Sequence, residues 1–325
     1  MDEYYEEEYR EIFRAEDPVI PLSRRIWVTW EEVTFQVPRN RGILGISAAS
    51  NYKSKLKGIW GGVGPGEIIS ILGEIKSGKS ILLNILSGHV KIKRGDLLTG
   101  RVLVNGFRRG QRWRRICAHV TNTQSQEELH GDLSVTEQLK FCAQLALPSK
   151  WPVERRLRVI DWVLESLNLH LVKNKQVDTL TMSERKQLSI GLALVGLPRV
   201  LLIDEPTEGL DPTRALELMK SIQKITTSRQ MSTIITAKQL RQATFPLIDR
   251  FLLLGQGATV YYGTLTDALI YFERTLHISI PTKDDNPLAC MLDAVSCFDC
   301  RRDPSHLERI QKEWQAYAFH HNNIT

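Results

Sequence analysis

The sequence predicts an α/β fold in which helices cover a mostly parallel β-sheet. The apolar runs at 68–72 and 200–204 are short and bounded by glycine or charge, which is typical of strands buried on both faces. A helical pattern follows each run, at 81–86 and after Asp211. A mainly helical stretch at 135–183 separates the two groups of strands. Strands that alternate with helices in this way form a largely parallel sheet.

The first part of the chain is expected to be mostly β-structure. Residues 26–38 alternate between apolar and polar side chains and are rich in β-branched residues, which predicts a strand. The basic segment 39–57 contains glycine and serine and predicts a loop. The run at 68–72 predicts a buried strand that leads through a glycine-bearing turn into a helix. Further short strands are expected at 102–104 and 115–120.

The later elements alternate between helix and strand. A helix is expected over 152–170, with one apolar face formed by Val153, Leu157, Ile160, Leu164 and Leu167. After the strand at 200–204, a helix is expected to begin with Asp211 as its N-cap and Pro212 at its first position. The apolar stripe of that helix is Ala215, Met219, Ile222 and Ile225. The last strands are expected at 233–236, 250–254 and 259–262.

The strongest motif is the sequence GEIKSGKS at 73–80, which fits the phosphate-loop pattern GxxxxGK[ST] between a buried strand and a helix. In such a loop, backbone N–H groups and the helix N-terminus cradle phosphates. Lys79 can reach the β- and γ-phosphates, and the Ser80 hydroxyl can ligate Mg²⁺. The expected nucleotide-binding residues are Gly73, Glu74, Ile75, Lys76, Ser77, Gly78, Lys79 and Ser80.

Two carboxylates end the second apolar run, in the sequence VLLIDEP at 200–206. Asp204 is expected to hold Mg²⁺ through water, and Glu205 to act as the general base that polarises the attacking water. Ligands of parallel sheets bind outside the carboxyl ends of the strands, where both residues lie. Together with the phosphate loop, the pair predicts the catalytic edge of an enzyme that hydrolyses nucleotides.

These motifs resemble the nucleotide-binding domains of ABC transporters, in particular the G subfamily with its white and pleiotropic drug resistance types. The resemblance runs from about Trp27 to about Tyr317 and is carried by KLKGIWGGVGPGEIISILGEIKSGKSILLNILSG, TGRVLVNG, DEPTEGLDPTRA, YYGTLTDALIYFE and NPLACMLDAVS. It implies a P-loop NTPase fold of the ABC ATPase type, with a mostly parallel sheet, an antiparallel β edge and a helical subdomain inserted in it.

The resemblance also implies an organisation of the chain. An ATP-binding domain is expected at 26–280, with its helical insert at about 126–190. An acidic N-terminal tail is expected at 1–25, and a C-terminal extension at 281–325 is expected to lead towards a transmembrane domain that this chain lacks. In the family, ATP and Mg²⁺ are bound between two cassettes, so the implied partners are a second cassette with an intact signature and a transmembrane domain. Asp211, in the GLD turn (D-loop), is expected to communicate with the opposing site.

Two departures from the family pattern bear on activity. The signature stretch, LTMSE at 180–184, has Met182 and Ser183 where the family has glycines that let the backbone approach the partner's γ-phosphate. Its degenerate residues are Thr181, Met182, Ser183 and Glu184, and it is most similar to the second cassette of fungal pleiotropic drug resistance pumps. The switch histidine is absent, and Lys238 or Gln239 stands in its place. Loss of such a group typically costs roughly 10²–10⁴ in rate, so slow hydrolysis is expected.

Milder departures from the family pattern concern a Mg²⁺ contact, the adenine contact and one position of the phosphate loop. The Q-loop glutamine, implied as a further Mg²⁺ contact, is either Gln124 or Gln126. The aromatic residue that stacks on adenine in many relatives is replaced by Val37, although Trp30 and Phe35 lie close in sequence. Lys76 stands where the family has glycine and is expected to point into solvent.

Composition and charge restrict the remaining function classes. A hydrophobic content of 42% with 25% charged residues is typical of folded soluble proteins. The longest apolar stretch, 188–197, is shorter than the roughly 20 residues of a membrane-spanning helix. The start MDEYYEEEYR is acidic, unlike a signal peptide, and the five cysteines are odd in number, which does not indicate a disulfide framework. The chain is therefore expected in the cytosol. The resemblance to ABC transporters implies a place at the cytosolic face of a membrane, attached through its partner.

The net charge of +6 is distributed unevenly. Eight acids and two arginines give the first 17 residues −6, so the remainder carries +12. The basic stretch at 108–115 is expected to be an exposed hairpin edge, and no nucleic-acid partner is expected.

The alternative function for the chain is that of a degenerate domain that binds ATP without hydrolysing it and serves as a regulatory or structural partner.

Overall fold

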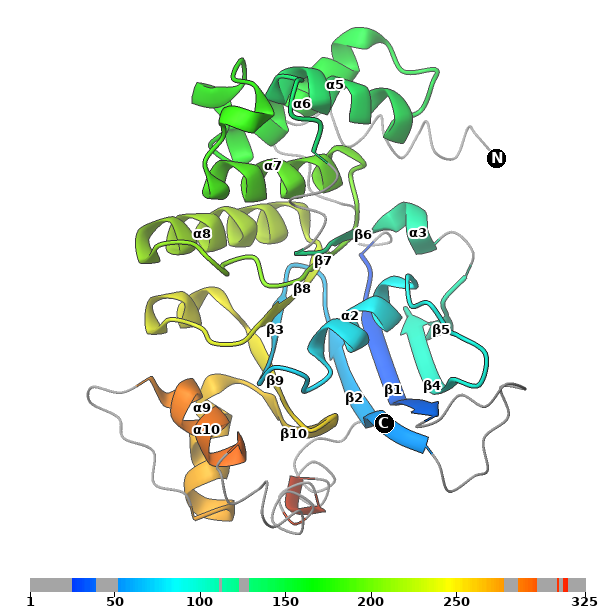
Figure 1. The fold of residues 1–325 in the computed structure, drawn as a ribbon, viewed down its shortest axis with the longest axis vertical. Coiled ribbons are helices and arrows are strands. Elements are labelled where there is room, and N and C mark those ends of the chain that lie inside the picture. Colours follow the sequence, from blue (N-terminus) through cyan, green and yellow to red (C-terminus); the bar gives the residue numbers. More distant parts are fainter. Residues whose placement is uncertain are drawn as a thin grey trace. The chain divides into compact units, whose positions relative to one another are not determined.

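A computed structural model of the chain describes residues 25–38, 52–110, 113–122, 129–277, 286–296, 309 and 312–314. Two compact units make up the chain, and each contains segments that are distant in sequence. Unit 1 contains Val63–Ile68 and Gly110–Ile235, and unit 2 contains Val28–Gly62, Ile69–Arg109 and the chain from Thr236 onward. Figure 1 labels the elements of both units.

Unit 1 is built on parallel strands. Strands β6 (Cys117–Val120), β7 (Val200–Ile203) and β8 (Ser232–Ala237) are neighbours in the order β8-β7-β6, with Val200 opposite both Cys117 and Ser232. Every side chain of β7 is buried, which explains why the strand reads as a continuous apolar run. The strand predicted at 200–204 is confirmed, and so is its parallel pairing.

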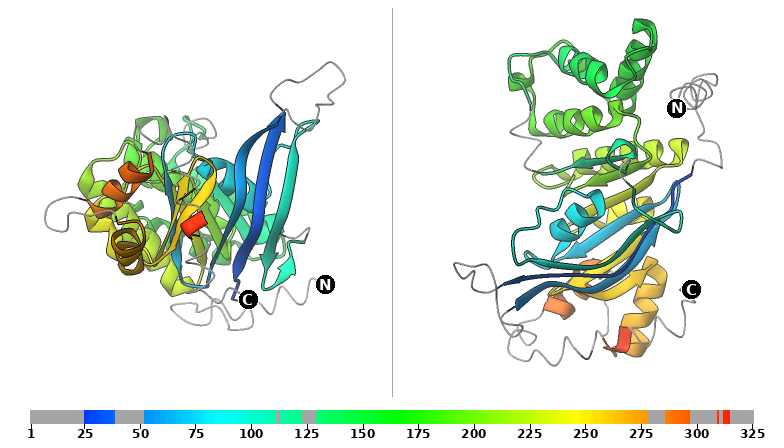
Figure 2. Two further views of the ribbon diagram at one scale, coloured as in Figure 1. Left: turned by 90° about the horizontal axis from the view of Figure 1, so that it is seen from below. Right: turned by 90° about the vertical axis from the view of Figure 1, so that its right-hand side faces the viewer.

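Helices form the rest of unit 1. Helices α5 (Val135–Ala146), α6 (Val153–Ser166) and α7 (Met182–Val195) pack against one another and lie together in Figures 1 and 2. Helix α8 (Pro212–Arg229) buries its predicted stripe completely. The shorter helical segments are α3 (Trp113–Ile116), η2 (His170–Val172) and η3 (Val177–Thr179).

Two local predictions in unit 1 are wrong. Residues 115 and 116 belong to α3, so the strand expected at 115–120 begins only at Cys117. The predicted stripe of α6 is correct at its C-terminal end but not at its start, where Val153 is 64% exposed. The buried face instead includes Val159 and Val163, because α6 packs against both α5 and α7 and this double contact shifts the covered face.

Unit 2 contains an antiparallel sheet. Strands β1 (Val28–Pro38), β2 (Tyr52–Val63), β4 (Leu97–Val104) and β5 (Phe107–Arg108) follow the order β2-β1-β4-β5, and Figure 2 shows the long strands running side by side. The loop predicted at 39–57 is wrong from Tyr52 onward. Lysines fill exposed positions of β2 while Leu56 and Ile59 are buried, so the charge of one face concealed the alternation.

The second group of strands in unit 2 carries the phosphate loop. Strand β3 (Ile68–Gly73) is parallel to β9 (Arg250–Gly255), and β10 (Ala258–Gly263) is antiparallel to β9. Helix α2 (Lys79–Ser87) follows β3 after the loop. The remaining elements are η4 (Gln242–Leu247), α9 (Leu265–Ile270), η5 (Tyr271–Thr275) and α10 (Pro287–Ser296). The predicted class, α/β with mostly parallel strands, an antiparallel β edge and inserted helices, is confirmed.

The described C-terminal residues pack within unit 2. The ring of Trp314 lies 5.1 Å from that of Tyr261 and 5.5 Å from that of Tyr271, measured between ring centroids. Leu288 and Met291 of α10 are buried. Within the part of the chain that the structure describes, no helix combines the length and the apolar character that crossing a bilayer requires.

Candidate functional site

The phosphate loop connects β3 to α2 with a backbone that requires glycine at both ends. A Cβ on Gly73 would lie 2.5 Å from the carbonyl oxygen of Leu254 and 2.5 Å from Ser77 Oγ. Gly78 has φ 107°, and a Cβ there would lie 2.6 Å from Leu56 Cδ2. Gly78 also precedes α2 without a side-chain cap, and the N-terminus of a helix favours a bound anion. The loop is therefore shaped for close approach of phosphate to backbone.

Lys79 is the buried cation of this loop. Its side chain is 5% exposed, and Nζ donates to the carbonyl oxygens of Gly73 at 2.6 Å and Glu74 at 2.9 Å. The ammonium group thus lies over the loop, where a phosphate cradled by the backbone would meet it. Lys76 is exposed, as expected, and Ser80 is exposed at the second position of α2. These residues fit a nucleotide phosphate chain with its Mg²⁺ ion.

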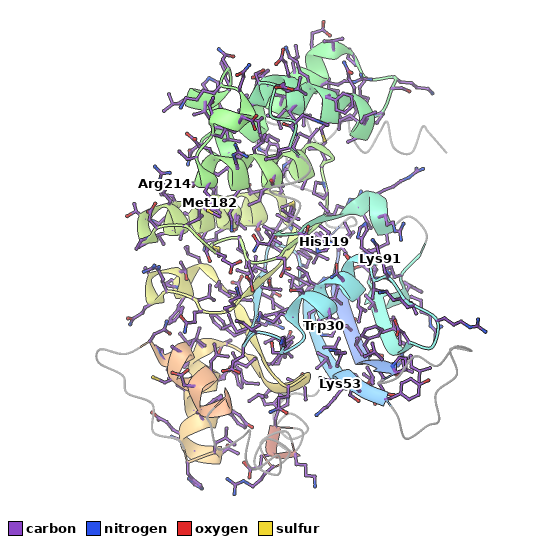
Figure 3. The ribbon with its side chains drawn as sticks, viewed as in Figure 1. Trp30, Lys53, Lys91, His119, Met182 and Arg214 are labelled. Carbon is purple, nitrogen blue, oxygen red and sulfur yellow. The ribbon has the colours of Figure 1, made fainter. Side chains whose placement is uncertain are left out.

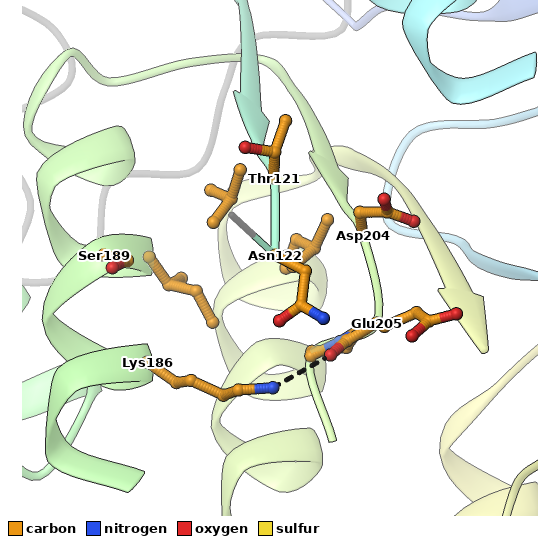
Figure 4. A pocket seen from close by; sticks show the side chains of 10 residues that line it. Thr121, Asn122, Lys186, Ser189, Asp204 and Glu205 are labelled. Atoms are coloured by element: carbon orange, nitrogen blue, oxygen red, sulfur yellow. Dashed lines mark hydrogen bonds between the residues drawn. The ribbon is translucent and has the colours of Figure 1, made fainter. Parts of the chain in front are cut away.

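The carboxylate turn, residues 204–208, follows β7 in unit 1. The backbone N–H of Asp204 donates to Val120 at 2.8 Å, which continues the β6–β7 pairing. Glu205 has φ 49°, in the left-handed region that costs a non-glycine residue about 1–3 kcal/mol. Both acidic side chains are half-buried, and Figure 4 shows their carboxylates directed to the same side of the turn. The turn can therefore present two acidic groups to one ligand.

Sequence reasoning missed two polar residues that contact this turn. Lys186 of α7 donates to its backbone, and Asn122, which follows β6, donates from Nδ2 to the Glu208 carboxylate. Lys186 is a charged residue among buried positions of α7 that are mostly apolar, which is a signal that could have identified it. Both residues line a small cleft with Ser189, Asp204 and Glu205 (Figure 4).

The signature stretch begins helix α7. Thr181 is the N-cap, and the Glu184 carboxylate accepts from Thr181 N at 2.7 Å and from its hydroxyl at 2.9 Å, which completes a capping box. Burial raises the pKa of the Glu184 carboxyl, but the hydrogen bonds from Thr181, with Lys175 and Arg214 nearby, outweigh burial and hold this pKa below its usual value. A carboxylate of the same chain therefore occupies this helix N-terminus.

We expect Thr181→Ala to lower the free energy of unfolding by about 1 kcal/mol at pH 7, because the helix loses its cap. The lowered pKa of Glu184 means that the capping box contributes stability above the unfolded value of about 4.3 and loses it as pH falls through the folded pKa. Urea denaturation at pH 7 and pH 4 should therefore show a smaller difference in the free energy of unfolding between wild type and Thr181→Ala at the lower pH. Thr227→Ala, at an exposed position of α8, is the matched control, and an equal loss in both variants would contradict the assignment.

Met182 packs against Gly209, which directly follows the carboxylate turn. Its side chain is 47% exposed, and a Cβ on Gly209 would lie 3.0 Å from both Sδ and Cε of Met182. Arg214 of α8 reaches the same region, since its Nη1 donates to Thr181 Oγ1 at 3.4 Å (Figure 3). The signature stretch is thus held against residues of its own unit.

Asp211 caps the N-terminus of α8, as predicted. Its Oδ1 accepts from Arg214 N at 3.0 Å, and Pro212 occupies the first helical position. Lys238 and Gln239, the residues predicted to stand at the switch position, follow β8 directly and are exposed. Gln124 and Gln126 lie outside the described residues.

The predicted site residues fall into two groups, one in each unit. The phosphate loop and the switch position belong to unit 2, whereas the carboxylates, the signature stretch and Asp211 belong to unit 1.

The aromatic residues near Val37 do not replace an adenine-stacking ring. Trp30 and Phe35 are both buried in β1, so neither presents a ring face to a ligand.

Comparison with known families gives a match over the central part of the chain. The family model described as ABC transporter matches residues 56–208, which include the phosphate loop, the signature stretch and the carboxylate turn.

Several curated proteins are similar over most of the chain. ABC transporter G family member 22 of Dictyostelium discoideum is 30% identical over 288 residues, which are 85% of this chain and 44% of that protein. G family member 2 of the same organism is 33% identical over 284 residues, 84% of this chain and 20% of its own length. ABC transporter G family member 26 of Arabidopsis thaliana is 29% identical over 307 residues, which are 89% of this chain and 43% of that protein. The chain therefore spans less than half the length of these relatives.

A solved structure has the same fold. It is cbiO1 from Clostridium perfringens, part of the ABC transporter complex cbiONQ, which matches with a TM-score of 0.62 at 23% identity. The match covers 77% of this chain and 96% of that one.

Proposed function

Because this chain contains an ATP-binding domain of the ABC transporter family, with homologues in the G family, we propose that it binds ATP with Mg²⁺ and hydrolyses it slowly to drive transport across a membrane. The observation that carries the proposal is the phosphate loop. Its glycines admit no side chain, and the ammonium of Lys79 lies over its carbonyl groups.

Each group of site residues has a role in this proposal. Residues 73–80 hold the phosphates through backbone N–H groups and Lys79. Ser80 and Asp204 are the Mg²⁺ contacts, with Gln124 or Gln126 as the Q-loop ligand. Mg²⁺ would neutralise charge that develops on the phosphates. Glu205 accepts a proton from the water that attacks the γ-phosphate.

The partner in this proposal is a second cassette. With Met182 and Ser183 in place of glycines, the chain offers a poor signature and a good phosphate loop, so its partner would supply the intact signature. This asymmetry matches the resemblance to the second cassette of fungal pleiotropic drug resistance pumps. A transmembrane domain completes the exporter, and the chain works on the cytosolic face of that membrane.

The proposed organisation follows from the same resemblance. The ATP-binding domain spans 26–280, with the helical insert at about 126–190 and an acidic tail at 1–25. Residues 281–325 form an extension towards the transmembrane domain. Transport specificity then resides in the transmembrane domain.

The test is a pair of measurements on the purified full chain. We expect fluorescent ATP to bind in the presence of Mg²⁺, and single-turnover hydrolysis to accelerate when a cassette with an intact signature and an inactivated phosphate loop is added. The inactivated loop ensures that the measured turnover belongs to this chain. A chain that does not bind ATP would falsify the proposal.

A second candidate function is a regulatory domain that binds ATP without hydrolysing it. Lys238 or Gln239 at the switch position favours this function, because a missing catalytic group lowers the rate by roughly 10²–10⁴. The packing of Met182 against Gly209 also favours it. This candidate is selected if the chain binds ATP but shows no turnover when it is mixed with the partner cassette (the paired sample).

A further inference from the structure

The backbone of the carboxylate turn depends on its surroundings for its conformation. Glu205 has φ 49°, a region that favours glycine. Within the turn, Glu208 N donates to the carbonyl oxygen of Glu205 at 3.2 Å. Strained backbone of this kind persists where neighbouring groups hold it in place. The direction of the Glu205 carboxylate therefore depends on what holds the turn.

Lys186 holds the turn at both ends. Its Nζ donates to the carbonyl oxygen of Glu208 at 2.6 Å and to that of Glu205 at 3.1 Å. The side chain is only 6% exposed. A buried ammonium group is costly unless it is hydrogen-bonded, and bonds from a charged donor are shorter and stronger than neutral ones. The two carbonyl groups thus stabilise the lysine, and the lysine fixes their positions.

The hydrogen bonds from Lys186 described above go to backbone carbonyl groups of the turn. Figure 4 shows the dashed bond from Lys186 to the main chain at Glu205, with the carboxylates of Asp204 and Glu205 on the opposite side. Bound to the carbonyl groups, Lys186 fixes the backbone that carries the Glu205 carboxylate.

Helix α7 contacts this region at two points one helical turn apart. Met182 lies against Gly209, and Lys186 binds the carbonyl groups of Glu205 and Glu208. Residues at i and i+4 share one face of a helix, so both contacts depend on the same placement of α7. Because α7 also begins at the signature stretch, the position of this helix is linked to the backbone that carries Glu205.

We propose that Lys186 is a positioning residue for hydrolysis: it fixes the backbone from Glu205 to Glu208 and makes the direction of the Glu205 carboxylate depend on the placement of α7. The inference rests on the proposed ATP hydrolysis, in which Glu205 acts as general base.

The experiment compares the full wild-type chain with Lys186→Met, which keeps the length of the side chain and removes its donors. With the partner cassette present, we expect single-turnover hydrolysis to fall about 10- to 100-fold, since a small misplacement of a catalytic group has effects of this size. ATP affinity should stay within about 3-fold, because no phosphate-loop residue is changed. Lys186→Arg keeps a charged donor and should recover part of the rate. Lys220→Met, at an exposed position of α8, is the control and should match wild type.

Hydrogen exchange tests the positioning role without relying on hydrolysis. We expect the backbone amides of 205 and 207–209 to exchange about 10-fold faster in Lys186→Met, while those of α2 are unchanged. Unchanged exchange in the turn, or an unchanged rate in an active sample, overturns the inference. If wild type binds ATP but shows no turnover, proposed hydrolysis fails, and with it the catalytic part of the inference. The exchange data then decide whether Lys186 holds the turn. If Lys186→Met does not fold, Lys186→Gln, a shorter neutral donor, takes its place in both measurements.

Discussion

Replacing Glu205 with glutamine is expected to lower single-turnover ATP hydrolysis by about 10²–10³-fold in the paired sample, because the amide cannot accept the proton of the attacking water. The substitution keeps the size of the side chain, and Lys186 binds the backbone at this position, so the turn should retain its conformation. ATP affinity should therefore change little. Rapid-quench measurement of ADP formation, together with equilibrium binding of ATP, separates these two quantities.

The control for this prediction is Glu217→Gln, which removes the same charge from an exposed position of α8. We expect its rate and affinity to equal those of wild type. If Glu205→Gln leaves the rate unchanged, the hydrolytic role of Glu205 is wrong. If both variants lose the same activity, the effect arises from net charge and not from proton transfer.

Replacing Lys79 with methionine is expected to weaken ATP binding by about 10- to 100-fold, since a charge-assisted hydrogen bond contributes about 1.5–3 kcal/mol. The methionine has a similar length but cannot donate to a phosphate. It also leaves the carbonyl groups of Gly73 and Glu74 without this donor, so thermal unfolding should be recorded alongside binding. Equilibrium titration with fluorescent ATP measures the affinity.

Lys76→Met provides a matched control within the same loop. Lys76 is exposed, whereas Lys79 is buried over the loop, so we expect the control to bind ATP within about 3-fold of wild type. Equal weakening in both variants would indicate general attraction by positive charge. An unchanged affinity in Lys79→Met would contradict the assignment of the loop as the phosphate site.

Local signals in the sequence predicted most of the elements around these residues. The run at 200–203 is apolar throughout because every side chain of β7 is buried, and the acidic turn begins directly after it. Asp211 followed by Pro212 predicted the start of α8, because both residues favour a helix N-terminus through their own chemistry. The phosphate loop could be identified in the same way, since its glycines and Lys79 are close together in the chain.

Predictions failed where neighbouring elements decide which face is covered. The lysines of β2 occupy its exposed face, so a basic segment that predicted a loop is a strand from Tyr52. At the start of α6, Val153 is exposed although its spacing predicted burial, because periodicity identifies a face but not the length over which neighbours cover it.

The sequence by itself determined the α/β class, the phosphate loop, the acidic pair and the departures in the signature stretch, because each is written in residues that are adjacent in the chain. Only the tertiary structure decided that Lys186 binds the carbonyl groups of Glu205 and Glu208, and that Met182 lies against Gly209. Both contacts join α7 to a turn that follows a different strand. Their existence depends on how these elements pack, and a linear pattern does not specify which buried polar group will satisfy which carbonyl.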